Sequence, residues 1–157
     1  MLGELIRKVV VLAFAAFCAA ASFAQSSTVT LITADEAKRP RAKSTDLTFR
    51  AGISRGPAIE LLSPRSSEAG IQSPIHLQLK FEGHGGAQID QASFKLIDVC
   101  DPPVDLTDRI KEFVNQAGVD VPAAAIPDGS YLIRAEVKDK EGRTGFLTFT
   151  INIAKQH

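Results

Sequence analysis

The sequence lacks tryptophan and contains a single tyrosine, Tyr131, among its 157 residues. Carbohydrate-binding proteins usually stack aromatic rings on sugars, so this shortage argues mildly against a sugar-binding platform. An excess of charge is also missing, because 18 basic and 18 acidic residues give a formal net charge of 0. A chain without net positive charge has no general electrostatic attraction to nucleic acid or anionic lipid. We therefore expect no nucleic-acid partner.

Motifs of familiar catalytic or metal-binding chemistry are absent from the sequence as well. The histidines at 76, 84 and 157 have no spacing typical of metal ligands, and no cysteine pair is available for zinc. Residues 83–86 are glycine-rich, but they are not followed by the Lys-Ser or Lys-Thr of a phosphate-binding loop. No G-x-S-x-G motif marks a nucleophilic serine. His84 lies near Glu82, where a surface turn is a better interpretation than a weak metal site. The sequence thus predicts no enzyme, and no catalytic, cofactor-binding or metal-binding residues.

Acidic residues do gather in three predicted loops, which hold Asp98, Asp101, Asp105 and Asp108; Asp120 and Asp128; and Asp139 and Glu141. Carboxylates at one end of a sandwich can bind Ca²⁺ through their oxygens. The chain has no D-x-D-x-D-G loop with a closing glutamate, however, and aspartates at caps and turns are explained by hydrogen bonds to the backbone. A small periplasmic protein that binds a ligand or calcium is therefore the alternative function.

The first 24 residues have the pattern of a secretory signal peptide. Arg7 and Lys8 precede an apolar run over residues 9–21, and Ser22-Phe23-Ala24 places small residues at the two positions that a signal peptidase reads. The apolar run is shorter than the roughly 20 residues that a membrane-spanning helix needs. We expect cleavage after residue 24, a periplasmic or secreted mature chain, and no stable membrane insertion after cleavage.

Cysteine is scarce, with Cys18 and Cys100 the two examples. Cys18 would leave with the signal peptide, so the mature chain could form no internal disulfide. Asp101 follows Cys100 and would raise the pKa of its thiol rather than lower it. We interpret Cys100 as a buried small hydrophobic residue; an intermolecular bridge or a reactive thiol is the functional alternative.

Residues 25–56 are rich in Ser, Thr, Lys, Arg and Pro, which predicts a flexible tail or linker. Residues 38–43 form a basic cluster that would suit an anionic lipid, glycan or cell-wall polymer. Because this cluster has only four charges and no interleaved aromatic residues, we favour its interpretation as part of a solvated linker. The short apolar run at residues 29–32 could pair at the edge of a sheet.

Two alternating segments near the end of the chain predict an antiparallel hairpin. Residues 131, 133, 135 and 137 form one apolar face, and residues 147, 149, 151 and 153 form another. A period of two with one apolar face is typical of a strand packed on one side and solvated on the other. Asp139 to Gly142 supplies the turn, because Gly142 can adopt the left-handed conformation that such a turn requires.

Further strands are predicted at residues 58–62, 75–82, 93–100 and, as an extended segment, 119–126. We expect Pro122 to keep the last of these away from the centre of a sheet, and a bulge near Asp98 to shift the register of the third. Leu106, Ile110, Phe113 and Val114 have helical spacing, with Gly118 expected to end that helix. The pattern predicts an all-β domain at residues 57–157, an immunoglobulin-like antiparallel β-sandwich of about seven strands with one short helical insertion. A small closed barrel is the alternative.

Several turn motifs resemble those of bacterial immunoglobulin-like domains of exported proteins. They are GPAIELLSP at residues 56–64, SPI at 73–75, GGAQIDQASFK at 85–95, PDGSY at 127–131 and DKEGRTG at 139–145. The resemblance covers about residues 57–154, and the helical stretch at 108–116 is longer than such a domain would lead us to expect. It implies an adhesion, spacer or accessory module, with no catalytic residues to carry over.

These observations lead to one functional hypothesis, an exported non-enzymatic module that binds an unknown protein or a cell-envelope polymer. The expected interaction surfaces are the loops, the basic tail and the exposed residues Arg134, Glu136 and Lys138, because loops on a rigid sandwich commonly carry function.

Overall fold

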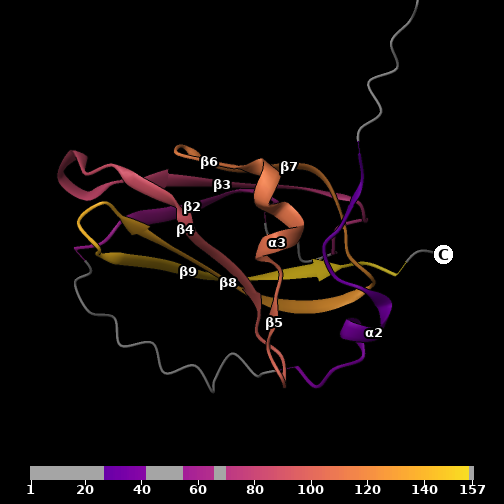
Figure 1. Ribbon diagram of the computed structural model, residues 1–157. Helices are drawn as coiled ribbons and strands as arrows, with labels where there is room; N and C mark the ends of the chain where they lie inside the picture. The colour runs from indigo at the N-terminus through magenta and orange to yellow at the C-terminus, as the bar shows by residue number, and fades with distance from the viewer. Residues whose placement is uncertain (1–26, 42–54, 66–69, 156–157) are drawn as a thin grey trace, which may run out of the picture.

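The computed structural model describes residues 27–41, 55–65 and 70–155, which form two β-sheets packed as layers (Figure 1). The elements in chain order are β1 (Val29–Thr30), α2 (Ala34–Ala37), β2 (Ala58–Ser63), β3 (Ile75–Glu82), η2 (His84–Gly86), β4 (Ile89–Asp98), β5 (Val104–Asp105), α3 (Thr107–Ile110), η3 (Lys111–Phe113), β6 (Val114–Asn115), β7 (Gly118–Ala125), β8 (Gly129–Asp139) and β9 (Thr144–Ile153). The expected signal peptide, residues 1–24, lies outside the described residues.

The two sheets have different sizes and a simple strand order. One sheet has the order β1-β7-β3-β2, with β6 also paired to β7, and the other has the order β5-β4-β8-β9. All strand pairs are antiparallel except β1 with β7, which is parallel. The prediction of a mostly β chain is confirmed, and the chain folds into two sheets rather than one closed barrel. No helix among the described residues is long and apolar enough to cross a membrane.

The predicted alternation places the core. In β8, residues 131, 133, 135 and 137 are all buried, and in β3 so are residues 75, 77, 79 and 81. Ile151 and Ile153 of β9 are buried too, while Leu147 and Phe149 pack against this core with part of their surface exposed. Phe81 of β3 and Phe94 of β4 meet between the layers with ring centroids 5.4 Å apart. The inward faces of both sheets therefore form one hydrophobic core.

The closing hairpin is confirmed in position and turn. The β8–β9 ladder extends from Gly129 opposite Ile153 to Lys138 opposite Thr144. The amide of Gly142 donates to the carbonyl oxygen of Asp139 at 2.9 Å, and Gly142 has a φ of +82°. Glycine adopts this left-handed conformation without the steric cost that a Cβ would add.

The helical insertion is shorter than its periodicity predicts. It consists of the single turns α3 and η3, after which Val114 belongs to β6 and Gly118 begins β7. The expectation that Gly118 ends a helix is therefore wrong. The apolar residues still fulfil their packing role, since Leu106 and Ile110 are fully buried. A helical spacing of buried residues cannot distinguish a continuous helix from one turn followed by a short strand.

Pro122 does not keep its strand at an edge, because β7 pairs with β3 on one side and with β6 and β1 on the other. The structure accommodates the missing N–H of this proline in an interruption of both ladders. On the β3 side, the register of β7 shifts between Val121 and Ala124. On the opposite side, the pairing with β6 ends at Val119 of β7, and the pairing with β1 begins at Ala124 of β7. Proline is tolerated inside a sheet where no ladder hydrogen bond is needed.

The register shift expected near Asp98 lies at the other end of β4. The β4–β8 ladder is regular from Lys95 to Asp98 and shifts between Asp90 and Lys95. Residues 93–100 were predicted to form a strand, and the observed strand begins earlier, at Ile89.

Residues 27–41 belong to the sandwich, so the expected tail at 25–56 is wrong for this segment. β1 pairs with β7, as the short apolar run suggested, and the amide of Leu31 donates to the carbonyl oxygen of Ala125 at 2.9 Å. Leu31 and Ile32 are 0% and 1% exposed. The segment therefore contributes a strand and two core side chains, which a solvated linker would not do.

Candidate interaction surfaces

The amino-terminal segment, residues 27–41, is fixed to the domain by a bidentate ion pair. Nη1 and Nη2 of Arg109 donate to Oε2 and Oε1 of Glu36 at 2.8 and 2.7 Å, and Nη1 also donates to the carbonyl oxygen of Leu31 at 2.7 Å. Thr33 and Glu36 form a capping box at the start of α2. The hydrogen bonds from Arg109, together with those at Thr33, outweigh the effect of burial and lower the pKa of Glu36 to about 2. Glu36 is therefore ionised in any near-neutral compartment.

A second contact closes the other end of this segment. Nη1 of Arg41 lies 2.5 Å from Oδ2 of Asp98, whose side chain is 1% exposed, and Nη2 donates to the carbonyl oxygen of Glu36 at 3.2 Å. The guanidinium of Arg41 also stacks on the ring of Tyr131, 4.3 Å from its centroid. Arg39 donates from Nη1 to the carbonyl oxygen of Pro102 at 3.1 Å. These two arginines of the predicted basic cluster hold the fold together and do not form a free cationic patch.

Cys100 lies beside this contact and is buried, as predicted. Its Sγ donates to the carbonyl oxygen of Pro102 at 3.2 Å. Burial, and then the negative charge of Asp98, raise the pKa of the Cys100 thiol. A thiol with a raised pKa is a poor nucleophile near neutral pH.

Arg134, Glu136 and Lys138, which were expected to be exposed, share one face of β8, where Arg134 and Glu136 are half-buried. We call this face, together with Phe146 of β9, the outer sheet face. Nε of Arg134 lies 2.6 Å from Oε1 of Glu136, and its guanidinium is 4.8 Å from the centroid of the Phe146 ring. Phe146 is 43% exposed, the largest value for a bulky hydrophobic side chain among the described residues. Lys138 is exposed. The face therefore offers an aromatic ring, a cation and an anion within one small area.

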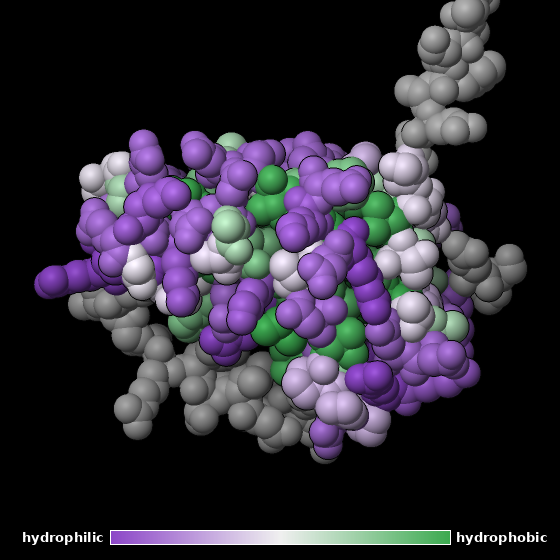
Figure 2. Space-filling view, viewed as in Figure 1, coloured by the Kyte–Doolittle hydropathy of each residue, from purple (hydrophilic) through white to green (hydrophobic). Residues whose placement is uncertain are grey.

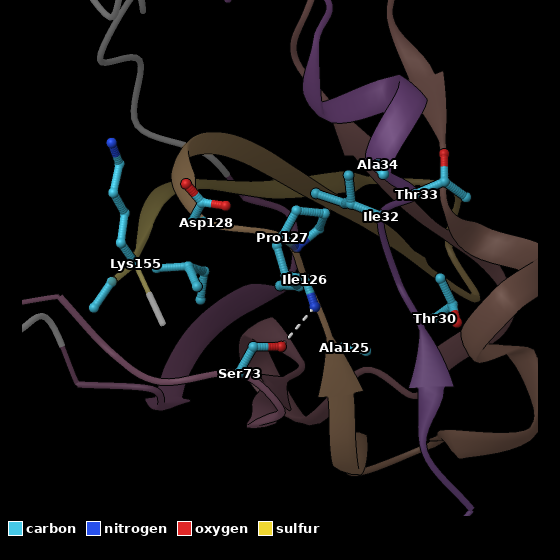
Figure 3. A pocket seen from close by; sticks show the side chains of 12 residues that line it. Thr30, Ile32, Thr33, Ala34, Ser73, Ala125, Ile126, Pro127, Asp128 and Lys155 are labelled. Carbon is cyan, nitrogen blue, oxygen red and sulfur yellow. Dashed lines mark hydrogen bonds between the residues drawn. The ribbon is translucent and has the colours of Figure 1, made fainter. Parts of the chain in front are cut away.

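A pocket of about 700 Å³ opens at one end of the sandwich, where the amino-terminal segment meets the β7–β8 connection and the end of β9 (Figure 3). Its lining includes Thr30, Thr33, Asp128 and Lys155. Figure 3 shows Asp128 and Lys155 on the side opposite Thr30 and Thr33. Ser73 accepts a hydrogen bond from the amide of Ile126 at 2.9 Å and fixes the floor. Sequence reasoning missed this pocket because one wall comes from the segment predicted to be a tail.

A groove of about 430 Å³ lies between β4 and α3, and we call it the β4-edge groove. It is lined by Gln91, Ala92, Phe94, Lys95, Asp105, Thr107, Asp108, Lys111 and Val114. Oδ1 of Asp105 accepts from the amide of Thr107 at 2.8 Å. Hydrogen bonding from Thr107, and to a smaller extent the charge of Lys95, lowers the pKa of Asp105. Figure 2 shows the face that carries α3, where hydrophobic patches lie between hydrophilic side chains.

The predicted acidic loops are engaged in local contacts rather than gathered around one point. Asp98 pairs with Arg41, and Asp105 accepts from the amide of Thr107. Asp120 lies 2.6 Å from Nε2 of His76, and Asp139 and Glu141 both contact Arg143 at 2.7 and 3.1 Å. Burial opposes ionisation of Asp139, but hydrogen bonds from Arg143 and from the turn amides outweigh it and lower its pKa. Within residues 27–41, 55–65 and 70–155, no group of three or more His, Cys, Asp or Glu side chains is placed to hold a metal ion. His84 forms part of η2 and is exposed.

Comparison with known proteins assigns no function to these surfaces. The chain matches no protein-family model, no curated protein and no solved structure.

Proposed function

We propose that the chain is an exported, non-enzymatic immunoglobulin-like module that binds a partner protein or a cell-envelope polymer. The strand order supports the fold assignment. An immunoglobulin-like sandwich has strands A, B and E adjacent in one sheet and strands C, F and G adjacent in the other. Here β2-β3-β7 and β4-β8-β9 have the same order along the chain and within the sheets. β6 has the place of strand D, because it precedes β7 in the chain and pairs antiparallel with it, and β1 adds a parallel strand to β7.

The observation that carries the fold assignment is the environment of Tyr131. Its hydroxyl donates to the carbonyl oxygen of Pro127 at 2.9 Å and lies 3.2 Å from that of Asp128. Many immunoglobulin-like sandwiches have such a tyrosine corner, in which a tyrosine near the start of strand F bonds to the backbone a few residues upstream. Tyr131 is near the start of β8, the strand equivalent to F, and is 1% exposed.

A binding role is supported by the kind of surface that this scaffold presents. A rigid sandwich holds exposed side chains and end loops in fixed positions, and residues in such positions commonly bind partners. The outer sheet face combines an exposed aromatic ring with Arg134 and Glu136. Aromatic residues and arginine are enriched where interfaces gain most of their affinity. Export is supported by the signal-peptide pattern at residues 1–24.

The first experiment tests export and binding separately. The full chain, expressed with a carboxyl-terminal tag, is fractionated, and its amino terminus is sequenced; we expect Gln25 as the first residue of an extracytoplasmic form. A photo-crosslinking amino acid then replaces Lys138 on the outer sheet face, with Glu60 of β2 on the other sheet as the matched exposed control. We expect position 138 to crosslink to one specific component of the cell envelope and position 60 to crosslink to none.

Two results would contradict the proposal. Retention of an uncleaved chain in the cytosol would exclude an exported module. Absence of any adduct from position 138, or equal adducts from both positions, would exclude a specific binding surface on the outer sheet face.

A further inference from the structure

One section of β4 has no strand partner. β4 pairs with β5 only at Ile97 and Asp98 among the described residues. In the ladder with β8, Asp90 lies opposite Lys138, and the next paired residue of β4 is Lys95, opposite Glu136. Among the described residues, 91–94 therefore have no register partner in either neighbouring strand. An unpaired strand edge presents N–H and C=O groups that can template the addition of another strand.

The structure holds this unpaired section in place through Ser93. Its Oγ accepts a hydrogen bond from the amide of Lys138 at 2.7 Å and donates to the carbonyl oxygen of Asp90 at 2.6 Å. The hydroxyl thus replaces a backbone group in the β8 ladder and fixes the bulge. Gln91 and Ala92 are exposed at the same place. Bulges that are fixed in this way often re-aim a strand next to a functional site.

The unpaired section lies along the β4-edge groove. Ala92 and Val114 give the groove an apolar part, and the ammonium groups of Lys95 and Lys111 and the carboxylate of Asp108 give it polar parts. None of these three charged groups forms an ion pair with another residue in the part of the chain that the structure describes. The groove therefore combines charges of both signs with a section of β4 that has no register partner.

We propose that the β4-edge groove binds an extended segment of a partner protein, which adds to β4 as a strand along residues 91–95. A polypeptide in extended form carries alternating backbone donors and acceptors, and every second side chain would point into the groove toward Ala92 and Val114. Residues 90–98 contain no proline that would block such pairing. Balanced charges suit a peptide better than a polyanion. Phe94 is 3% exposed and offers no ring for sugar stacking, so a protein partner is favoured over an envelope polysaccharide.

This inference rests on the proposed binding function and names both the partner class and a surface that adjoins the outer sheet face, since Lys95 is the register partner of Glu136. The probe is a set of heptapeptides selected from a displayed random library on the full chain. Their contact residues are mapped by amide chemical shifts, and each peptide is also made with N-methyl groups on alternate residues. N-methylation keeps the side chains but removes the donors that a strand needs. Loss of two or more backbone hydrogen bonds should weaken binding about tenfold or more.

The variants test the same geometry from the side of the protein. Ala92→Pro removes the amide N–H at position 92 of the section without a register partner and should weaken peptide binding about tenfold, while its circular dichroism spectrum reports whether the fold is kept. Lys111→Glu reverses a charge at the groove without touching the backbone and should alter peptide preference. Lys140→Glu, in the exposed β8–β9 turn, is the matched control and should change neither affinity nor preference.

Shifts confined to residues 91–95 and lost on N-methylation support the inference. Peptides that bind at the outer sheet face overturn it and leave the proposed binding function intact. The inference is also overturned if soluble peptidoglycan fragments change the amide chemical shifts of residues 91–95 and no selected peptide does, because the groove would then bind a polymer. Failure of the crosslinking at position 138 does not affect these outcomes, so the two proposals fail separately.

Discussion

Replacement of Leu31 by alanine tests whether the amino-terminal segment belongs to the folded domain. Leu31 is 0% exposed, and deletion of a fully buried leucine side chain usually costs about 2 to 5 kcal/mol, depending on how far the cavity collapses. Small domains unfold with only about 5 to 15 kcal/mol, so the loss is a large fraction of the total. At roughly 4 °C per kcal/mol for a chain of this size, the midpoint of thermal unfolding should fall by about 8 to 20 °C.

The matched control is Leu62→Ala, which removes the same atoms from a side chain that is 39% exposed. It should cost less than about 1 kcal/mol, because much of the deleted surface already contacts water. Urea unfolding followed by far-ultraviolet circular dichroism suits a chain without tryptophan, and the slope against urea should remain that of the unmodified chain. If Leu31→Ala lies within about 0.5 kcal/mol of Leu62→Ala, the segment is not part of the cooperative unit.

Four further substitutions test three local features by the same urea assay. Glu36→Gln removes the ion pair with Arg109 and should cost about 1 to 2 kcal/mol near neutral pH, less than the full pKa shift would give because water reaches the pair. The folded-state pKa of Glu36 is lowered from 4.5 to about 2, so its contribution is complete above pH 4.5 and is lost as pH falls toward 2, and the two stability curves should converge there; parallel curves would refute this. Gly145→Ala should destabilise by more than about 3 kcal/mol, since a Cβ would lie 1.8 Å from a backbone oxygen, whereas Gly142→Ala has open space and should cost about 1 kcal/mol for its positive φ; similar losses for the two would contradict the close approach. Tyr131→Phe keeps the ring and removes the hydroxyl, so we expect a loss of about 1 to 2 kcal/mol, and no loss would mean that the tyrosine corner contributes nothing.

The strands of the core were predictable because their signal is local. In β3, and in β8 from Ile133 onward, each inward apolar side chain is followed by an outward polar one. This period identifies a strand with one buried face whatever its partner. The hairpin turn was predictable for the same reason, since Gly142 and Asp139 are turn-forming residues at the correct spacing. The order of the strands within each sheet depends on contacts between residues that are far apart in the sequence. The local pattern therefore says little about which strands are neighbours.

The amino-terminal segment was missed because its apolar part is too short to show a period. Leu31 and Ile32 are consecutive and both buried, a pattern that alternation does not detect, and the surrounding residues have the composition of a linker. The capping box of Thr33 and Glu36 was a detectable signal for α2. Pro122 was misinterpreted because proline is usually excluded from central strands, whereas here its neighbours on both sides are interrupted at that position.

The docking of the amino-terminal segment has a consequence for binding. One wall of the end pocket consists of residues 30–34, which Leu31 and the pair of Glu36 with Arg109 hold in place. A ligand in this pocket would bind only the form of the chain in which the segment is docked. It would therefore stabilise that form by RT ln(1 + [L]/Kd). Leu31→Ala should then weaken that ligand as well as the fold. Lys138 and the β4-edge groove contain no residue of the segment, so ligands there should keep their affinity in the same variant as long as the sandwich stays folded.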